Sequence, residues 1–392
     1  MKTLKAAVIG VGPRGMGMLR TISSVEGLEI AAICDIDTAL IEKAKERAAE
    51  IGITPEYYVN YKDIIARGDI DCVFVITNWT THWRICRDFM KAGIWTSTEV
   101  NGANAIEECW ELVRTYEETG VPCMMLENCN YGRYEMAVLN MVEQGVFGEV
   151  VYAECGYCHD LRKETHFERC SYRDENNLRR NGDLYPTHGV GPMAKILKIN
   201  HGNRFVSLTS MSTKARGVND YGARHYPDHK NTTANYACGD VTTTLIKCAG
   251  GEVLMVRHNT ASPRPYSRAN LVQGTRAIYS EDKGTEGRTG AVHIDDVHEH
   301  GQWVQMDDLF DKYEHPMWKD YKASPMDGHG GMDYLVIKAF VDSARDKTEP
   351  PIDTYDTAVM MAVTCLSEQS VAMGSMPVPF PDFTCGLWVH RK

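Results

Sequence analysis

A glycine-rich run near the start of the chain has the spacing of a phosphate-binding turn. The run GVGPRG, residues 10–15, follows an apolar segment, and Asp35 ends the next apolar segment. Gly10 permits the tight turn, Gly12 lets a pyrophosphate approach the backbone, and Gly15 lets the following helix lie close to the sheet. Asp35 can accept hydrogen bonds from both hydroxyls of a ribose and would repel a 2′-phosphate. We therefore expect NAD rather than NADP, the alternative being a degenerate nucleotide site.

A second group of residues has the chemistry of proton transfer. The segment LYPTHG, residues 184–189, presents Tyr185 and His188 from one turn, because the proline between them fixes the backbone. Both side chains can carry protons near neutral pH when burial and neighbours tune their pKa values. His159 with Asp160, and His329 between glycines, are weaker candidates. These residues predict acid–base chemistry.

The cysteines and histidines do not have the spacing of a metal site. Cys155 and Cys158 form one Cys-x-x-Cys pair without a second pair, and on a strand they would face opposite sides. The tract HIDDVHEH, residues 293–300, is expected to be a solvated acidic loop. An odd number of cysteines, 13, scattered through apolar segments favours reduced thiols over a disulfide framework. We expect no bound metal.

Strands and helices alternate through the first third of the chain, as the glycine-rich turn requires. Strands are expected at residues 4–10, 28–35, 71–77, 94–100 and 121–127, and helices from about residue 14 and at 38–51, 81–92 and 105–119. Such alternation specifies a parallel sheet covered on both faces. The chain is therefore expected to be an α/β protein whose residues 1–128 form a doubly wound, NAD-binding Rossmann domain.

Residues 129–392 are expected to form a separate substrate-binding α+β domain. A helix at 131–144 precedes strands at 149–157, 206–213, 239–248, 253–258 and 269–273, and helices at 332–346 and 357–373 follow. These strands predict an open, mainly antiparallel sheet, with one face available for a substrate pocket or for another subunit. A homo-oligomer, either a dimer or a tetramer, is expected.

The charge balance excludes several classes of partner. The chain has 42 Lys and Arg against 53 Asp and Glu, which repels nucleic acid and anionic membranes. Its apolar runs are too short to cross a bilayer, and no apolar signal segment precedes the first strand. We expect a soluble cytoplasmic protein with a small-molecule substrate, no nucleic-acid partner and no membrane partner.

Two further segments resemble turns of the Gfo/Idh/MocA oxidoreductases. They are TNWTTH, residues 77–82, and TEVN, residues 98–101, where that family carries Thr-Pro-x-x-x-His and Glu-Lys-Pro. Glu99 matches the family's glutamate, which lies beside the nicotinamide ribose. Val100 stands where the family's dehydrogenases usually have a catalytic lysine. Because valine cannot move a proton, another residue must deprotonate the hydroxyl that gives up hydride.

One branch that shares this departure is glycoside hydrolase family 109, the NAD-dependent α-N-acetylgalactosaminidases. The chain resembles that branch over nearly its whole length. The resemblance rests on the segments ENCNY (127–131), LNMV (139–142), GVFGE (145–149), GYCHDLR (156–162), LYPTHG (184–189), SPRPYS (262–267), GHGGMD (328–333) and PDFT (381–384).

The resemblance implies roles for individual residues. It implies a catalytic site lined by Tyr185, His188, Tyr131 and Tyr266, although Tyr131 and Tyr266 taken alone would be packing residues. It also implies a cofactor site made by Gly10, Gly12, Pro13, Arg14, Gly15, Asp35, Thr77, His82, Glu99 and Asn128.

The resemblance further implies hydrolysis without net redox. In that branch NAD takes hydride from the sugar C3, the C2 proton is lost, the C1 group is eliminated, water adds and the hydride returns. One alternative is a sugar dehydrogenase or a 3-keto-glycoside processing enzyme of the same fold, and another is a non-catalytic NAD sensor. Val100 argues against the dehydrogenase, and the tyrosine and histidine motifs argue against the sensor. We therefore expect a glycoside as the substrate.

Overall fold

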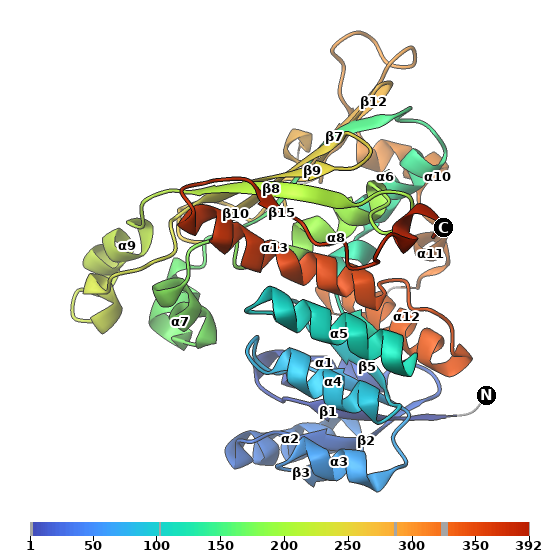
Figure 1. Cartoon of the computed structure of the whole chain (residues 1–392), viewed down its shortest axis with the longest axis vertical. Helices are drawn as coiled ribbons and strands as arrows, with labels where there is room; N and C mark the ends of the chain where they lie inside the picture. Colours follow the sequence, from blue (N-terminus) through green and yellow to red (C-terminus); the bar gives the residue numbers. More distant parts are fainter. Residues whose placement is uncertain (1–2, 102, 286–287, 323–327, 392) are drawn as a thin grey trace. The chain divides into compact units, whose positions relative to one another are not determined.

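Figure 1 shows the computed structural model of the chain, which describes residues 3–101, 103–285, 288–322 and 328–391. The chain forms two compact units. Unit 1 contains Met1–Tyr131 and Tyr321–Met361, and unit 2 contains Gly132–Asp320 and Ala362–Lys392. Among the helices of the described residues, none has the length and apolar character needed to cross a bilayer.

Unit 1 is built on a parallel sheet. Within the described residues its strands lie in the order β3-β2-β1-β4-β5-β6, and every neighbouring pair is parallel. β4 and β5 are buried along their whole length, as in a sheet covered on both faces, which confirms the predicted Rossmann fold. The strands are β1 (Leu4–Ile9), β2 (Leu28–Cys34), β3 (Glu56–Tyr58), β4 (Cys72–Val75), β5 (Trp95–Thr98) and β6 (Cys123–Met125).

The helices of unit 1 have clear start and stop signals. Asp37 caps α2 by accepting a hydrogen bond from the Ala39 N–H, and Gly52 ends that helix in the left-handed conformation. Helix α12 packs against α1 and the 3₁₀ turn η1. The short elements β3 and α3 were not predicted. The helices are α1 (Pro13–Ser23), α2 (Thr38–Ile51), α3 (Tyr61–Arg67), α4 (His82–Lys91), α5 (Ile106–Thr119), η1 (Asn128–Tyr131), η6 (His329–Gly331), α12 (Met332–Asp346) and the first part of α13 (Thr354–Ala372).

Unit 2 is built on a large sheet that is antiparallel except where β7 meets β10. Within the described residues the order is β14-β13-β12-β11-β7-β10-β9-β8-β15. This confirms the predicted open, mainly antiparallel sheet. The strands are β7 (Val150–Cys158), β8 (Phe205–Ser212), β9 (Thr242–Cys248), β10 (Val253–Asn259), β11 (Leu271–Gly274), β12 (Ala277–Ser280), β13 (Ala291–Ile294), β14 (Val304–Gln305) and β15 (Val378–Pro379).

The two faces of this sheet differ. Side chains alternate between buried and exposed along β9, so one face is covered and the other is open. Helix α8 (Thr187–Ile196) packs on the covered face against β7 and β10. On the open face, Met211 of β8 is 64% exposed and Leu245 of β9 is 48% exposed.

Several short helices of unit 2 were not predicted. They include the π-helical turn η2 (Glu164–Arg169), α7 (Tyr172–Arg179), α9 (Gly217–His225) and η3 (Lys230–Thr233). Buried polar groups tie them together: Asp174 accepts from His166 at 2.6 Å, from Asn231 at 2.9 Å and from Tyr236 at 3.0 Å. The helix predicted at residues 131–144 is α6 (Arg133–Glu143). The remaining short elements are η4 (Glu281–Lys283), η5 (Met306–Leu309), α10 (Phe310–Tyr313), α11 (Pro316–Asp320) and η7 (Leu387–Val389).

Candidate active site

The glycine-rich turn joins β1 to α1, and its three glycines have different surroundings. A Cβ on Gly10, whose φ is 93°, would lie 2.5 Å from the carbonyl oxygen of Ile76. A Cβ on Gly15 would lie 2.1 Å from the carbonyl oxygen of Gly10, whereas nothing lies within 4 Å of that position on Gly12. The turn is therefore closely packed at two glycines and open at Gly12, where a pyrophosphate has to approach the backbone.

Helix α1 begins directly after this turn, in a segment that is fully described. Pro13 occupies the first turn, and no side chain caps the helix, so its N–H groups remain for a phosphate. At the end of β2, the Asp35 carboxylate accepts hydrogen bonds from the N–H groups of Val11 at 2.8 Å and Asp37 at 2.9 Å. Beside it, Ile36 is 90% exposed and offers an apolar surface for an adenine ring. These features fit a dinucleotide cofactor.

Arg14 joins the glycine-rich turn to two carboxylates. Its Nε donates to Glu99 Oε1 at 2.9 Å, and its Nη1 and Nη2 donate to Asp333 Oδ2 and Oδ1 at 2.8 and 3.1 Å. Burial disfavours the charge of Arg14, but Glu99 and Asp333 outweigh this effect, so its pKa lies above the ordinary value. Asn128 Nδ2 also donates to Asp333 Oδ1, at 2.7 Å. Three of the predicted cofactor residues thus meet around Asp333, which was not among the predicted site residues.

A glycine-rich loop places His329 against the same carboxylate. His329 Nδ1 lies 2.8 Å from Asp333 Oδ2, and 59% of the histidine side chain is exposed. Because Nδ1 bonds the carboxylate, Nε2 is the ring nitrogen left to exchange a proton with a ligand. Burial would raise the pKa of Asp333, but the hydrogen bonds from His329 and Arg14 hold it well below its usual range. The carboxylate therefore stays ionised.

The turn after β4 contains the predicted residues Thr77 and His82. The His82 ring is 1% exposed, and its Nε2 lies 2.5 Å from the Thr77 carbonyl oxygen. Burial lowers the pKa of His82, so the neutral ring donates Nε2–H to that carbonyl. We infer that His82 stabilises this turn, and a direct contact with the cofactor stays a prediction for both residues. In the neighbouring turn, the buried Val100 donates its N–H to Glu99 Oε2 at 3.1 Å.

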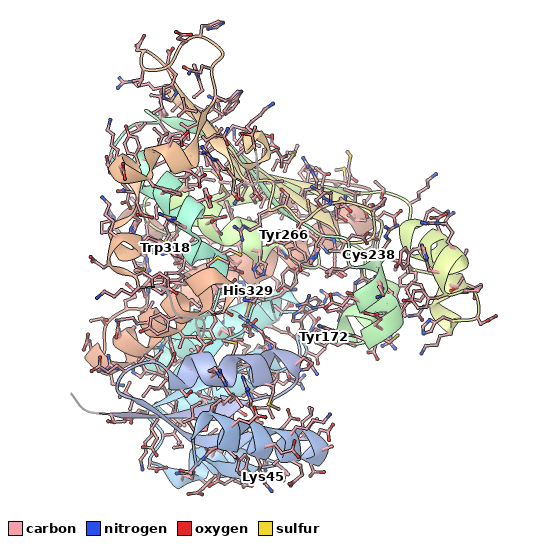
Figure 2. All side chains as sticks on the ribbon, turned by 180° about the vertical axis from the view of Figure 1, so that it is seen from behind. Lys45, Tyr172, Cys238, Tyr266, Trp318 and His329 are labelled. Carbon is pink, nitrogen blue, oxygen red and sulfur yellow. The ribbon has the colours of Figure 1, made fainter. Side chains whose placement is uncertain are left out.

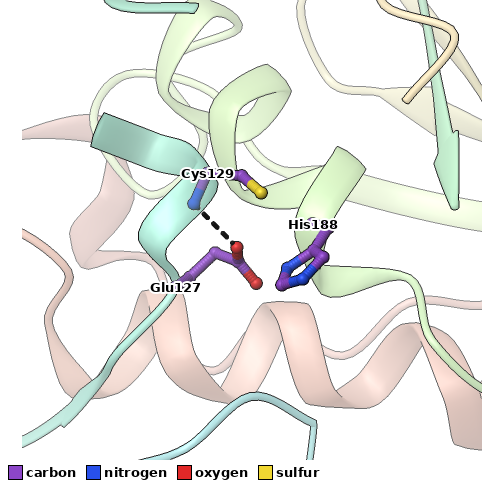
Figure 3. Close-up of side chains that lie close together, drawn as sticks. All are labelled: Glu127, Cys129 and His188. Carbon is purple, nitrogen blue, oxygen red and sulfur yellow. Dashed lines mark hydrogen bonds between the residues drawn. The ribbon is translucent and has the colours of Figure 1, made fainter. Parts of the chain in front are cut away.

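Glu127 and Cys129 follow the last strand of the parallel sheet. Figure 3 shows the hydrogen bond from the Cys129 N–H to Glu127 Oε1, at 3.0 Å. Glu127 is fully buried and lies just beyond the carboxyl end of β6. Folds with a parallel sheet bind their ligands at this end of the strands. Tyr131, at the end of η1, is also buried, which raises the pKa of its hydroxyl. Glu127 was not among the predicted site residues.

In unit 2, five rings form one contiguous group, called the ring cluster below: Tyr157, His159, Tyr185, His188 and Tyr266. The Tyr157 centroid lies 4.5 Å from that of Tyr185 and 5.5 Å from that of His188, and the latter two are 5.0 Å apart. Tyr266 lies 5.1 Å from His159 and 6.3 Å from Tyr157. Tyr157 and Tyr185 are buried, whereas Tyr266, labelled in Figure 2, is 48% exposed. The structure thus brings the predicted Tyr185, His188 and Tyr266, and the weaker candidate His159, together around Tyr157, which was not predicted.

Close packing of α8 on β7 builds this cluster. His188 lies in the first turn of α8, not in the non-helical turn that was predicted, and Pro186 occupies the position before the helix. A Cβ on Gly189 would lie 2.8 Å from Cys155 Cβ and 2.7 Å from the Gly156 nitrogen. Only glycine lets the helix approach the strand this closely, and the approach presents His188 beside the ring at the end of β7.

Arg173, on the unpredicted helix α7, brings a positive charge to the cluster. Its guanidinium carbon lies 4.7 Å from the Tyr185 ring centroid, and its Nη2 lies 3.4 Å from the Tyr185 hydroxyl. Burial disfavours the charge, but the hydroxyls of Tyr185, Tyr172 and Tyr157 outweigh this and raise the pKa of Arg173. Arg173 therefore remains a cation, suited to stabilising an anion beside Tyr185.

Burial shifts the pKa values of several titratable groups near the ring cluster toward their neutral forms. Burial raises the pKa of Asp183 to about 7, against the lowering effect of the hydrogen bond from the Tyr185 N–H. Burial, and secondarily the charge of Arg173, lowers the pKa of His258 to about 4. Burial also lowers the pKa of His159. The cation Arg173 thus lies beside the ring cluster, and Asp183, with a pKa of about 7, titrates near neutral pH.

Comparisons with known proteins match the chain to two families, one for each part of the sequence. The family model described as "Glycosyl hydrolase 109, C-terminal domain" matches residues 131–390. The model described as "Oxidoreductase family, NAD-binding Rossmann fold" matches residues 4–127. A glycosyl hydrolase family 109 protein of Shewanella sp. (strain W3-18-1) is 41% identical over 100% of this chain and 87% of its own length. An alpha-N-acetylgalactosaminidase of Tannerella forsythia is 37% identical over 99% of this chain and 88% of its own length.

Solved structures with the same fold include dehydrogenases of levoglucosan and of scyllo-inositol. A levoglucosan dehydrogenase in complex with NADH has a TM-score of 0.74 at 17% identity, covering 96% of this chain and 99% of that one. A scyllo-inositol dehydrogenase from Lactobacillus casei, with NAD(H) and scyllo-inositol bound, has a TM-score of 0.68 at 13% identity, covering 96% and 99%. At these identities the likeness shows the fold alone. The full-length match at about 40% identity decides the family, and this chain belongs to glycosyl hydrolase family 109.

Proposed function

We propose that the protein is an NAD-dependent glycosidase that cleaves N-acetyl-α-galactosaminides by transient oxidation of the sugar. The observation that carries this proposal is the ring cluster with Arg173, in a chain that also has a dinucleotide-binding turn. The substrate class rests on relatives named alpha-N-acetylgalactosaminidase in Tannerella forsythia and Shewanella oneidensis.

We assign cofactor binding and substrate binding to the two parts of the chain that match the two family models. We propose that residues 1–128 form the NAD-binding domain and residues 129–392 the substrate-binding domain, with Tyr321–Met361 of the second segment packed into compact unit 1. Bound NAD supplies an acceptor for one hydride from the sugar and later returns it. Asp35 selects NAD over NADP, because its carboxylate is fixed at the end of β2 by two backbone N–H groups.

The residues of the chain supply the proton transfers. A ketone at C3 makes the C2 proton acidic, and loss of that proton allows the C1 group to leave. Tyr185 and His188 act as bases for the C3 hydroxyl and the C2 proton, and Arg173 stabilises the negative charge that develops on the sugar. In unit 1, His329 has an exposed imidazole held by Asp333, so it can exchange a proton with a ligand bound there.

We also propose that the protein assembles as a dimer or tetramer through the open face of the sheet in unit 2. Met211, Leu245 and Met255 occupy adjacent strands on this face: Leu245 pairs with Met255, and Met211 pairs with Thr243, two residues before Leu245. Tyr152 and Arg257 lie on the same face, and methionine, aromatic and arginine side chains are enriched in protein interfaces.

Nitrophenyl N-acetyl-α-galactosaminide without added NAD tests the proposed activity. Catalytic release of nitrophenol without steady accumulation of NADH is expected. A dehydrogenase would accumulate NADH, and an NAD sensor would release nothing. Protein denatured after purification should yield near-stoichiometric NAD, and recovery of NADP instead would overturn the assignment of Asp35.

Turnover in heavy water tests the elimination route. Displacement at C1 uses two carboxylates and leaves the C2 proton in place. Elimination removes that proton, so the released sugar should carry deuterium at C2. Unlabelled product, together with full retention of deuterium from a C2-deuterated substrate in ordinary water, would contradict elimination.

A further inference from the structure

We propose that Asp333 is a positioning residue that holds the proton-carrying His329 and the nucleotide-turn residue Arg14 in one fixed arrangement. The inference rests on the proposed function and extends it. It assigns no contact with substrate to Asp333, which acts through its two partners. The consequence is that cofactor retention and proton transfer both depend on one buried carboxylate.

The hydrogen bonds around Asp333 define its position. Its Oδ1 accepts from Asn128 Nδ2 at 2.7 Å and Arg14 Nη2 at 3.1 Å, while its Oδ2 accepts from Arg14 Nη1 and His329 Nδ1, both at 2.8 Å. The Asp333 side chain is 5% exposed, whereas those of Arg14 and His329 are 34% and 59% exposed. A buried acceptor thus fixes two side chains that ligands can reach, which is an arrangement typical of a site.

The loop that carries His329 has a strained backbone conformation next to the Asp333 carboxylate. Residues 328 to 331 all have positive φ, with values of 60°, 42°, 67° and 107°, and His329 is the one residue among them with a Cβ. A Cβ on Gly328 would lie 2.6 Å from Asp333 Oδ2. Left-handed backbone at a histidine costs free energy and persists where the surroundings enforce it. The bond to Asp333 is the enforcing contact.

The second partner of Asp333 is Arg14, which belongs to the nucleotide-binding turn. Arg14 lies between the open Gly12 and the closely packed Gly15, and its guanidinium is shared between Asp333 and Glu99. When the Asp333 charge is lost, Arg14 still pairs with Glu99, but its guanidinium gains freedom to move against the phosphate-binding turn. Asp333 therefore influences how long the dinucleotide stays bound.

Two measurements on purified holoenzyme distinguish the effect of Asp333 through Arg14, called the cofactor arm, from its effect through His329, called the histidine arm. One is the rate at which bound NAD exchanges with added radiolabelled NAD, which needs no turnover. The other is kcat and KM on nitrophenyl N-acetyl-α-galactosaminide. Asp333→Asn should speed exchange and lower kcat, each by roughly 10-fold or more, with KM changed by less than about 3-fold. Asp353→Asn, a change at another buried carboxylate of unit 1, is the matched control and should leave both rates unchanged.

Double variants test whether Asp333 acts through His329. In a His329→Ala background, Asp333→Asn should lower kcat by less than about 3-fold further, while exchange still accelerates. Gly328→Ala should lower kcat and also speed exchange, because its Cβ would meet Asp333 Oδ2, the oxygen that holds both His329 and Arg14. This exposed position remains informative if Asp333→Asn does not fold.

Three results would contradict the proposed role of Asp333. Independent, multiplicative losses of kcat in the double variant would overturn the histidine arm, and so would full activity of Gly328→Ala. Unchanged exchange in folded Asp333→Asn would overturn the cofactor arm. A wild-type protein that releases no nitrophenol would instead refute the proposed function, while the exchange assay would still report on Arg14 and Asp333.

Discussion

Arg173 offers the sharpest single test of the chemistry in unit 2, because its charge cannot be replaced by another group in the ring cluster. We predict that Arg173→Met lowers kcat strongly and leaves bound NAD in place. Methionine has similar length and fills the half-buried position without a charge. The change therefore removes the cation beside Tyr185 while keeping the packing of α7.

The expected size follows from Coulomb's law. The guanidinium lies 3.4 Å from the Tyr185 hydroxyl, so an anion formed there is about 4 Å from the positive charge. At that separation, unit charges interact with about 1 kcal/mol in water and about 4 kcal/mol at an effective dielectric constant of 20. Arg173 is half-buried, so a loss of about 2 to 3.4 kcal/mol is expected. This corresponds to a decrease in kcat of about 30-fold to 300-fold.

The assay is steady-state hydrolysis of nitrophenyl N-acetyl-α-galactosaminide at pH 7, with NAD content measured in parallel. Arg180→Met is the control, since Arg180 follows the same helix and pairs with Glu368, outside the ring cluster. It should keep wild-type kcat. If Arg173→Met retains activity within about 5-fold while folded, no anion forms beside Tyr185. Equal losses in both arginine variants would point to the stability of this helix as the cause.

Three further outcomes are expected. His188→Ala should lower kcat by roughly 100-fold or more with NAD retained. The control His315→Ala, just before α11, should keep wild-type kcat. Near-normal turnover of His188→Ala would make His188 a packing residue. Burial raises the pKa of Asp183 to about 7, so folding favours its protonated form and its contribution to stability is lost as pH rises through 7. The free energy of unfolding of Asp183→Asn, relative to wild type, should thus be higher at pH 9 than at pH 5 by up to about 3 kcal/mol, and an equal difference at both values would refute the linkage. Met211→Glu should lower the oligomeric mass measured by light scattering, while Val297→Glu, at an exposed apolar residue elsewhere, should not.

The nucleotide-binding part could be predicted because its signals are local. The glycine spacing, Asp35 and the alternating apolar segments all lie within a short stretch of chain, and the structure has the expected parallel sheet. The short β3 and α3 were missed because three and seven residues carry little periodicity. The position of Asp333 beside Arg14 was also not predictable, since 319 residues separate them.

The ring cluster could be predicted only in part. Helix α8 contains two glycines and Pro192, which are poor helix formers, so local propensity indicated a turn where packing on β7 produces a helix. Tyr157 left a weak signal, its place in the GYCHDLR segment at the end of a strand. Arg173 left none, because α7 is polar, short and tied into unit 2 by the buried Asp174.

Position 100 connects these observations to the difference between a dehydrogenase and a hydrolase. Val100 is buried, and its N–H bonds Glu99, so the turn keeps its shape without the lysine of the related dehydrogenases. Elimination needs proton transfers at the C3 hydroxyl, at C2 and at the leaving group, and one lysine cannot serve three positions. In unit 2, His188 on α8 and Tyr185 just before that helix can divide this work. We therefore propose that valine is tolerated because proton transfer has moved to these residues, in which case Val100→Lys alone should not produce steady NADH formation.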